Sequence, residues 1–155
     1  MTDVTAEPKL YIPGLAGLWQ SLAPYGYPIM RFAAGAILIE HGWVKLVDGT
    51  APGLAEHLLG PMGFPFPIVW AYFLGLLESV GCLCLAVGLF TRPIAAMLVV
   101  ELFIITFAVH FRNGYSFSAP HGGYEYPLLL TALYLGILFR GSDRCSIDRL
   151  IGRQF

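Results

Sequence analysis

Four ionisable side chains within one long apolar stretch constrain this chain more than any other feature. Residues 27–46 read YPIMRFAAGAILIEHGWVKL. At about 1.5 Å per residue, a helix over these positions is about 30 Å long, the thickness of the hydrocarbon layer of a membrane. Charged groups are expensive at that depth, so they indicate a functional site or buried partners. The four residues are Arg31, Glu40, His41 and Lys45.

Helical spacing places most of these groups on one side. With about 100° per residue, Gly35, Gly42 and Lys45 share the face of Arg31, and His41 lies on the same side. Glycines on a membrane helix let a second helix approach closely. The pattern therefore predicts a polar, closely packed seam. In the alternative interpretation, Arg31 and Lys45 extend toward the two headgroup regions and His41 is a hydrogen-bonded core residue.

Composition supports a single membrane domain. The chain has 155 residues, of which 57% are hydrophobic and only 12% are charged, against roughly a quarter charged in average soluble domains. The lipid bilayer is the expected partner, and the net charge of −1 argues against nucleic acid. Residues 1–12 are polar, so no cleavable signal peptide is expected. We find no zinc, haem or flavin motif, so no metal site is predicted.

The hydrophobic pattern predicts an all-α, membrane-embedded four-helix bundle. Spans are expected at 27–46, 68–90, 93–111 and 124–139. Apolar residues within 13–23 recur at helical spacing, which predicts a short N-terminal interfacial helix. The expected organisation is a tail and interfacial helix over 1–24, a four-span domain over 25–140 and a cytoplasmic tail over 141–155.

The basic residues predict the orientation. With four spans, most of them fall on the side of the two termini, and only Lys45 and Arg112 fall opposite. Basic residues collect on the cytoplasmic side, so both termini are predicted to be cytoplasmic in a bacterial plasma (inner) membrane. The residues on the terminal side are Lys9, Arg92, Arg140, Arg144, Arg149 and Arg153.

Acidic residues in the later spans supply possible partners for these cations. Glu78 and Glu101 fall near the centre of their predicted spans, and Glu125 falls toward the outer side. We expect Lys45 to lie beside Glu101 or Glu125, in a polar cluster reached from the outer half of the membrane. Arg31, on the inner side, is interpreted as marking the inner boundary.

Several motifs together resemble the DoxX family of small four-helix membrane proteins. The first runs from Arg31 to Leu46 as R-x3-G-x5-HG-x2-KL, and Glu78 matches an acidic residue in the second span of the family. The GGYEY run at 122–126 resembles the family's loop into the fourth span. The tail GSDRCSID at 141–148 is similar to a family ending closer to GPGRYSLD, with Ser142 and Asp143 replacing Pro and Gly. The resemblance covers residues 31–148.

The resemblance implies a subunit of a quinone-linked oxidoreductase or redox-stress complex. Reducing a quinone requires protons, so titratable groups beside apolar walls would be needed, and a partner protein would supply the electron carrier. The predicted proton-relay (catalytic) residues are His41, Glu78 and Glu101. The predicted quinone-binding residues are Arg31, Trp43, Lys45, Glu125 and Tyr126.

Two other functions remain open from the sequence. The chain could be a non-catalytic membrane scaffold that docks a soluble redox partner, with its buried charges fixing helix register. It could also form a pathway for protons or a small molecule. The glycine-rich helix faces make a homodimer plausible under each of these hypotheses.

Overall fold

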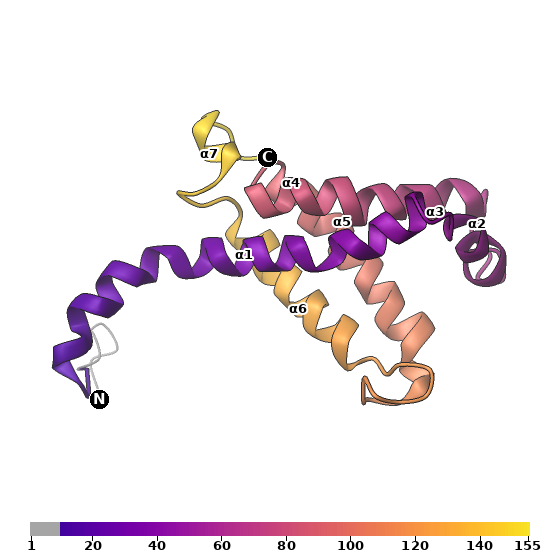
Figure 1. Cartoon of the computed structure of the whole chain (residues 1–155), viewed down its shortest axis with the longest axis horizontal. Coiled ribbons are helices and arrows are strands. Elements are labelled where there is room, and N and C mark those ends of the chain that lie inside the picture. Colours follow the sequence, from indigo (N-terminus) through magenta and orange to yellow (C-terminus); the bar gives the residue numbers. More distant parts are fainter. Residues whose placement is uncertain (1–9) are drawn as a thin grey trace, which may run out of the picture.

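The structure, a computed structural model, describes residues 10–155, and this part of the chain is helical without β-strands (Figure 1). The tail predicted over residues 1–9 lies outside the described residues. Three helical segments are long and apolar enough to cross a membrane, namely Pro13–Leu46, Pro67–Val87 and Thr91–Asn113. A further helix, α6 (Glu125–Arg140), has 16 residues and is shorter than these three.

The first segment consists of the 3₁₀ turn η1 (Pro13–Leu15) and the 31-residue helix α1 (Ala16–Leu46). The N-terminal part of α1 extends past the other helices and bends (Figure 1). Pro24 and Pro28 lie inside α1, where each removes a backbone donor. The separate interfacial helix predicted over 13–23 is therefore wrong as an independent element, because the helix continues through both prolines.

The second segment is one continuous helix made of α3 (Pro67–Leu76), the π-helical turn η3 (Leu77–Gly81) and α4 (Cys82–Val87). The loop before it contains α2 (Ala51–Leu54) and the π-helical turn η2 (Ala55–Leu59). The third segment contains α5 (Thr91–Ile104), the π-helical turn η4 (Ile105–His110) and the 3₁₀ turn η5 (Phe111–Asn113). A short helix, α7 (Ile147–Leu150), lies in the C-terminal tail.

Close packing of α1 against the second segment depends on glycine. A Cβ atom at Gly35 would lie 2.6 Å from the backbone nitrogen of Ala86, and one at Gly42 would overlap the backbone of Ser79. The predicted closely packed seam is therefore present, and it is formed within the chain. Helix α6 packs mainly on α5 and reaches α1 through Tyr134, whose hydroxyl donates to the carbonyl of Ala34 at 2.8 Å.

Candidate functional site

A cavity of about 530 Å³ lies among the C-terminal part of α1, the α2–η2 loop, the second segment and α5–η4. Its size falls within the range of small-molecule sites in proteins, roughly 300–1,000 Å³. Most of its wall is apolar. The ionisable side chains that line it are Lys45, Glu78, Glu101 and His110.

All three π-helical turns within residues 10–155 contribute to the cavity wall. Leu58 and Leu59 come from η2, Glu78 comes from η3, and His110 comes from η4. A π-helical turn inserts one residue into a helix and is frequently found at functional sites, because it redirects side chains that a regular helix would orient elsewhere. Three π-helical turns from separate parts of the chain thus contribute to the wall of one cavity.

Lys45 and Glu78 form an ion pair at the edge of the cavity. The side chain of Glu78 is 6% exposed and that of Lys45 is 18% exposed. The Lys45 ammonium also donates to the backbone carbonyl of His41, one helical turn earlier, at 3.2 Å. The pair thus links α1 to the second segment beside the tight contact at Gly42.

Glu101 has Glu78 and Lys45 as charged neighbours, but its carboxyl group forms no well-aligned hydrogen bond or ion pair with either. It is 7% exposed, and neither carboxyl oxygen forms a hydrogen bond with any residue in the described part of the chain. A buried polar group that lacks a partner destabilises a protein by about 1–3 kcal/mol, so such groups are rare in folded chains. A carboxyl group that faces a cavity in this state is available to a ligand.

The cavity reaches the surface of the helices among apolar side chains. Trp70, Phe73, Met97 and Val100 line it and are also partly exposed on the outside of the protein. In a membrane, exposed apolar residues at this depth face lipid tails.

A second, more polar cavity of about 710 Å³ shares Lys45 and Leu54 with the first. Glu40, His41 and Thr50 line it. Lys45 thus lies between a largely apolar cavity and a polar one.

Comparison with known proteins identifies the family. The DoxX family model matches residues 26–111, which include α1 from Gly26 onward, the second segment and most of the third. The chain belongs to the DoxX family. An uncharacterized protein of Haemophilus influenzae is 31% identical over 127 residues, covering 81% of this chain and 90% of that protein. No solved structure matches the chain. Family membership and the three long apolar helices establish a DoxX membrane protein.

Three of the eight predicted site residues of this DoxX protein meet at the first cavity: Lys45, Glu78 and Glu101. Lys45 forms its ion pair with Glu78, and Glu101, beside which it was expected, lines the same cavity, whereas Glu125 does not. His41 is exposed and lines the second cavity. The catalytic and ligand-binding roles of all four stay predictions.

Three other predicted residues lie away from both cavities. Trp43 is exposed on α1. The Glu125 carboxylate accepts a hydrogen bond from the backbone N–H of Phe117 at 3.1 Å, within the loop before α6. Tyr126 packs against the core, with its ring centroid 5.9 Å from that of Phe117. The structure does not bring these side chains to Lys45, and their proposed roles stay predictions.

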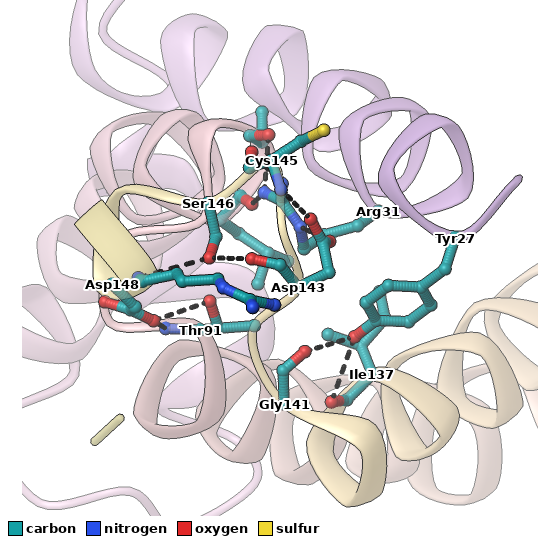
Figure 2. A network of polar contacts seen from close by, with 12 residues as sticks. Tyr27, Arg31, Thr91, Ile137, Gly141, Asp143, Cys145, Ser146 and Asp148 are labelled. Carbon is teal, nitrogen blue, oxygen red and sulfur yellow. Dashed lines mark hydrogen bonds and ion pairs between the residues drawn. The ribbon is translucent and has the colours of Figure 1, made fainter. Parts of the chain in front are cut away.

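Arg31, the eighth residue, forms a separate buried centre elsewhere along α1 (Figure 2). It is 1% exposed, and its guanidinium donates to the Asp143 carboxylate at 3.0 Å and to the carbonyls of Leu85 and Ala86 at 2.6 Å each. It also donates to the carbonyl of Cys145 at 3.0 Å. We call these groups the Arg31 cluster. The interpretation that Arg31 extends to the headgroup region is wrong, because these acceptors hold it inside the protein.

A second aspartate of the C-terminal tail, Asp148, binds the start of α5 (Figure 2). The Asp148 carboxylate accepts hydrogen bonds from the backbone N–H groups of Phe90 and Thr91 at 2.8 and 3.0 Å, and from the Thr91 hydroxyl at 2.8 Å. It therefore caps the N-terminus of α5 from a distant part of the sequence. The Tyr27 hydroxyl donates to the carbonyl of Gly141 at 2.6 Å.

The sequence did not identify Asp143 and Asp148 as important residues. Asp148 lies in the tail motif that resembles the family ending, so this motif was the sequence feature that could have indicated its importance. Asp143 stands where the family ending has Gly. In the structure, Asp143 itself makes the contact with Arg31.

Proposed function

We propose that this protein binds a membrane quinone in the first cavity, as the membrane subunit of a quinone-linked oxidoreductase. The observation that carries the proposal is the buried, unpartnered carboxyl group of Glu101 within a largely apolar cavity. This arrangement suits a flat apolar molecule with a few polar atoms at its edge. The partly exposed apolar side chains at the cavity wall support entry from the bilayer.

The cavity residues fit the chemical groups of a quinone. The Lys45 ammonium can donate a hydrogen bond to a ring carbonyl, and its pairing with Glu78 keeps it at the cavity edge. Trp70 and Phe73 provide aromatic walls for a flat ring. The Glu101 carboxyl is free to exchange a hydrogen bond or a proton with the ligand. A bound quinone supplies reversible two-electron, two-proton chemistry, and a partner protein is proposed to provide the electrons.

The proposal includes a location and an orientation. We infer that the protein lies in a bacterial plasma membrane, with α6 as a fourth span and both termini cytoplasmic. The support is the distribution of basic residues, since Arg92 and the tail arginines lie at the Arg31 end while Lys45 and Arg112 lie toward the other. The first cavity is then in the outer half of the bilayer.

Tryptophan fluorescence provides a direct test, because one of the three tryptophans lines the cavity. Replacing Trp19 and Trp43 by Phe leaves Trp70 as the only indole. We expect a short-chain ubiquinone analogue to quench Trp70 saturably in detergent-purified protein. Glu101→Leu in this background is expected to raise the Kd about tenfold or more, because it removes a hydrogen-bonding group from an apolar site.

Glu40→Leu is the matched control, since it removes a carboxyl group that lies outside the first cavity. It should leave the Kd within about twofold. Quenching that does not saturate, or that is equal in the Glu101→Leu and Glu40→Leu proteins, would contradict a quinone site in this cavity.

A further inference from the structure

The charged residues of the C-terminal tail are divided between the inside and the outside of the protein. Its two aspartates point inward, Asp143 to Arg31 and Asp148 to the N-terminus of α5. The four arginines within residues 140–153 are exposed. We call them the arginine surface: Arg140, Arg144, Arg149 and Arg153. Because both aspartate carboxylates form their contacts inside the protein, the outer face of the tail is strongly cationic.

The tail is fixed to the helices at several points, so this surface has a defined position. The Arg31 and Asp148 contacts hold its first half (Figure 2). At the far end, the ring of Phe155 packs 4.7 Å from that of Phe90, and Arg92 donates to the Gln154 side chain at 3.1 Å. The arginine surface is therefore held beside the ends of the membrane segments.

Exposed apolar side chains accompany the arginines. Leu150 is 83% exposed and Phe139 is 76% exposed, and Ile151 lies next to Leu150 in the exposed end of the tail. Basic and apolar side chains in alternation, at the end of a membrane helix, match the headgroup region, where arginine contacts phosphate and apolar groups enter the acyl boundary. A soluble acidic partner would account for the arginines but not for these exposed apolar groups.

We propose that the arginine surface binds the headgroups of anionic phospholipids. The guanidinium group matches phosphate through two parallel hydrogen bonds, and a cluster of basic residues next to a membrane helix attracts anionic lipid. The net negative charge of the lipid complements a face on which the tail shows arginines and no free side-chain carboxylate among residues 140–155. This site is independent of the first cavity and of any quinone chemistry.

Native mass spectrometry of the full-length protein in a neutral detergent tests the proposal. The protein is titrated with phosphatidylglycerol or with phosphatidylcholine of the same acyl chains. We expect at least a tenfold preference for phosphatidylglycerol, and we expect this preference to fall when the salt concentration is raised. Replacing Arg144, Arg149 and Arg153 together by Gln should reduce the preference to less than threefold.

Arg112→Gln is the control, because it removes a basic residue from the opposite end and should retain the preference. A thermal melt of the triple variant checks that the tail is still fixed, and we expect Tm within a few degrees of that of the native protein, since the exposed arginines contribute little to stability. Equal binding of both lipids by the native protein would overturn the proposal and favour an acidic soluble partner. An unchanged preference in the triple variant would also overturn it.

Discussion

The Arg31 cluster and the group formed by Lys45, Glu78 and Glu101 lie toward opposite ends of α1, and they differ in how far their polar atoms are satisfied. Arg31 uses all three guanidinium nitrogens, in contacts with one carboxylate and three backbone carbonyls. In the second group, which we call the Lys45 cluster, one ion pair is formed and the third carboxyl group has no partner in the described chain.

This difference separates a structural role from a binding role. The acceptors of Arg31 come from the second segment and from the tail, and they line neither of the two cavities. Those contacts connect parts of the fold. The Lys45 cluster, in contrast, borders a cavity that reaches the surface among apolar residues. In the Arg31 cluster every guanidinium nitrogen has an acceptor, whereas in the Lys45 cluster the Glu101 carboxyl group is available. The variants below test this difference.

Removal of Arg31 should have the largest effect. Arg31→Met leaves a buried Asp143 carboxylate and three carbonyls without their donor, and breaking a buried pair in this way costs about 3–5 kcal/mol. We expect this loss in the free energy of unfolding, measured by denaturant titration in micelles. The control Arg144→Met removes an exposed arginine and should change stability by less than about 0.5 kcal/mol. Equal effects of the two variants would refute a structural role for the Arg31 cluster.

Loss of the Asp148 cap should rank second. Asp148→Ala leaves the N–H groups of Phe90 and Thr91 and the Thr91 hydroxyl without an acceptor, and we expect a loss of about 2–3 kcal/mol. Asp148→Asn keeps one side-chain oxygen of similar position and should recover about half of the loss. Both values come from the same unfolding titration. If the two variants were equally destabilised, hydrogen bonding by this side chain would not be the cause.

The Lys45–Glu78 pair should have an intermediate effect because Lys45 is partly exposed. Glu78→Gln is expected to lower the free energy of unfolding by about 1–2 kcal/mol. In a double-mutant cycle with Lys45→Met, the coupling energy between the two positions should be about 1 kcal/mol. A coupling energy of zero would show that the pair makes no net contribution to stability.

Removal of Glu101 should affect stability least. The carboxyl group has no partner to lose, so we expect Glu101→Leu to change the free energy of unfolding by no more than about 1 kcal/mol, with stabilisation as the favoured sign. The same variant is expected to weaken binding of the quinone analogue, as described above. A loss of more than about 3 kcal/mol would place Glu101 with Arg31 among the structural groups.

Much of the helical architecture could be predicted because hydrophobic length and period are local properties. The stretches that became α1, the second segment and the third segment were identified in this way. The helix predicted separately over 13–23 is instead mostly the first part of α1. Pro24 and Pro28 are usual signals for a helix end, but a bent helix can continue through them.

The partners of the charged residues could not be predicted, because they depend on how the helices face one another. Contact between Gly42 and the backbone of Ser79 brings Glu78, rather than Glu101, next to Lys45. The π-helical turns rotate side chains by an amount that periodicity does not reveal. The Arg31–Asp143 pair joins positions 112 residues apart, and nothing in the local sequence of either indicates the other.

The separation between Arg31 and Asp143 also has a consequence for biosynthesis. Arg31 is synthesised with α1, 112 residues before its carboxylate partner, and the Asp148 cap follows later still. Until residues 143–148 are made, the guanidinium lacks two of its four acceptors, the Asp143 carboxylate and the Cys145 carbonyl, and α5 lacks its cap. Synthesis of the tail to Asp148 is therefore the step that allows this end of the protein to close. A chain truncated before residue 141 would leave the guanidinium with only the carbonyls of Leu85 and Ala86.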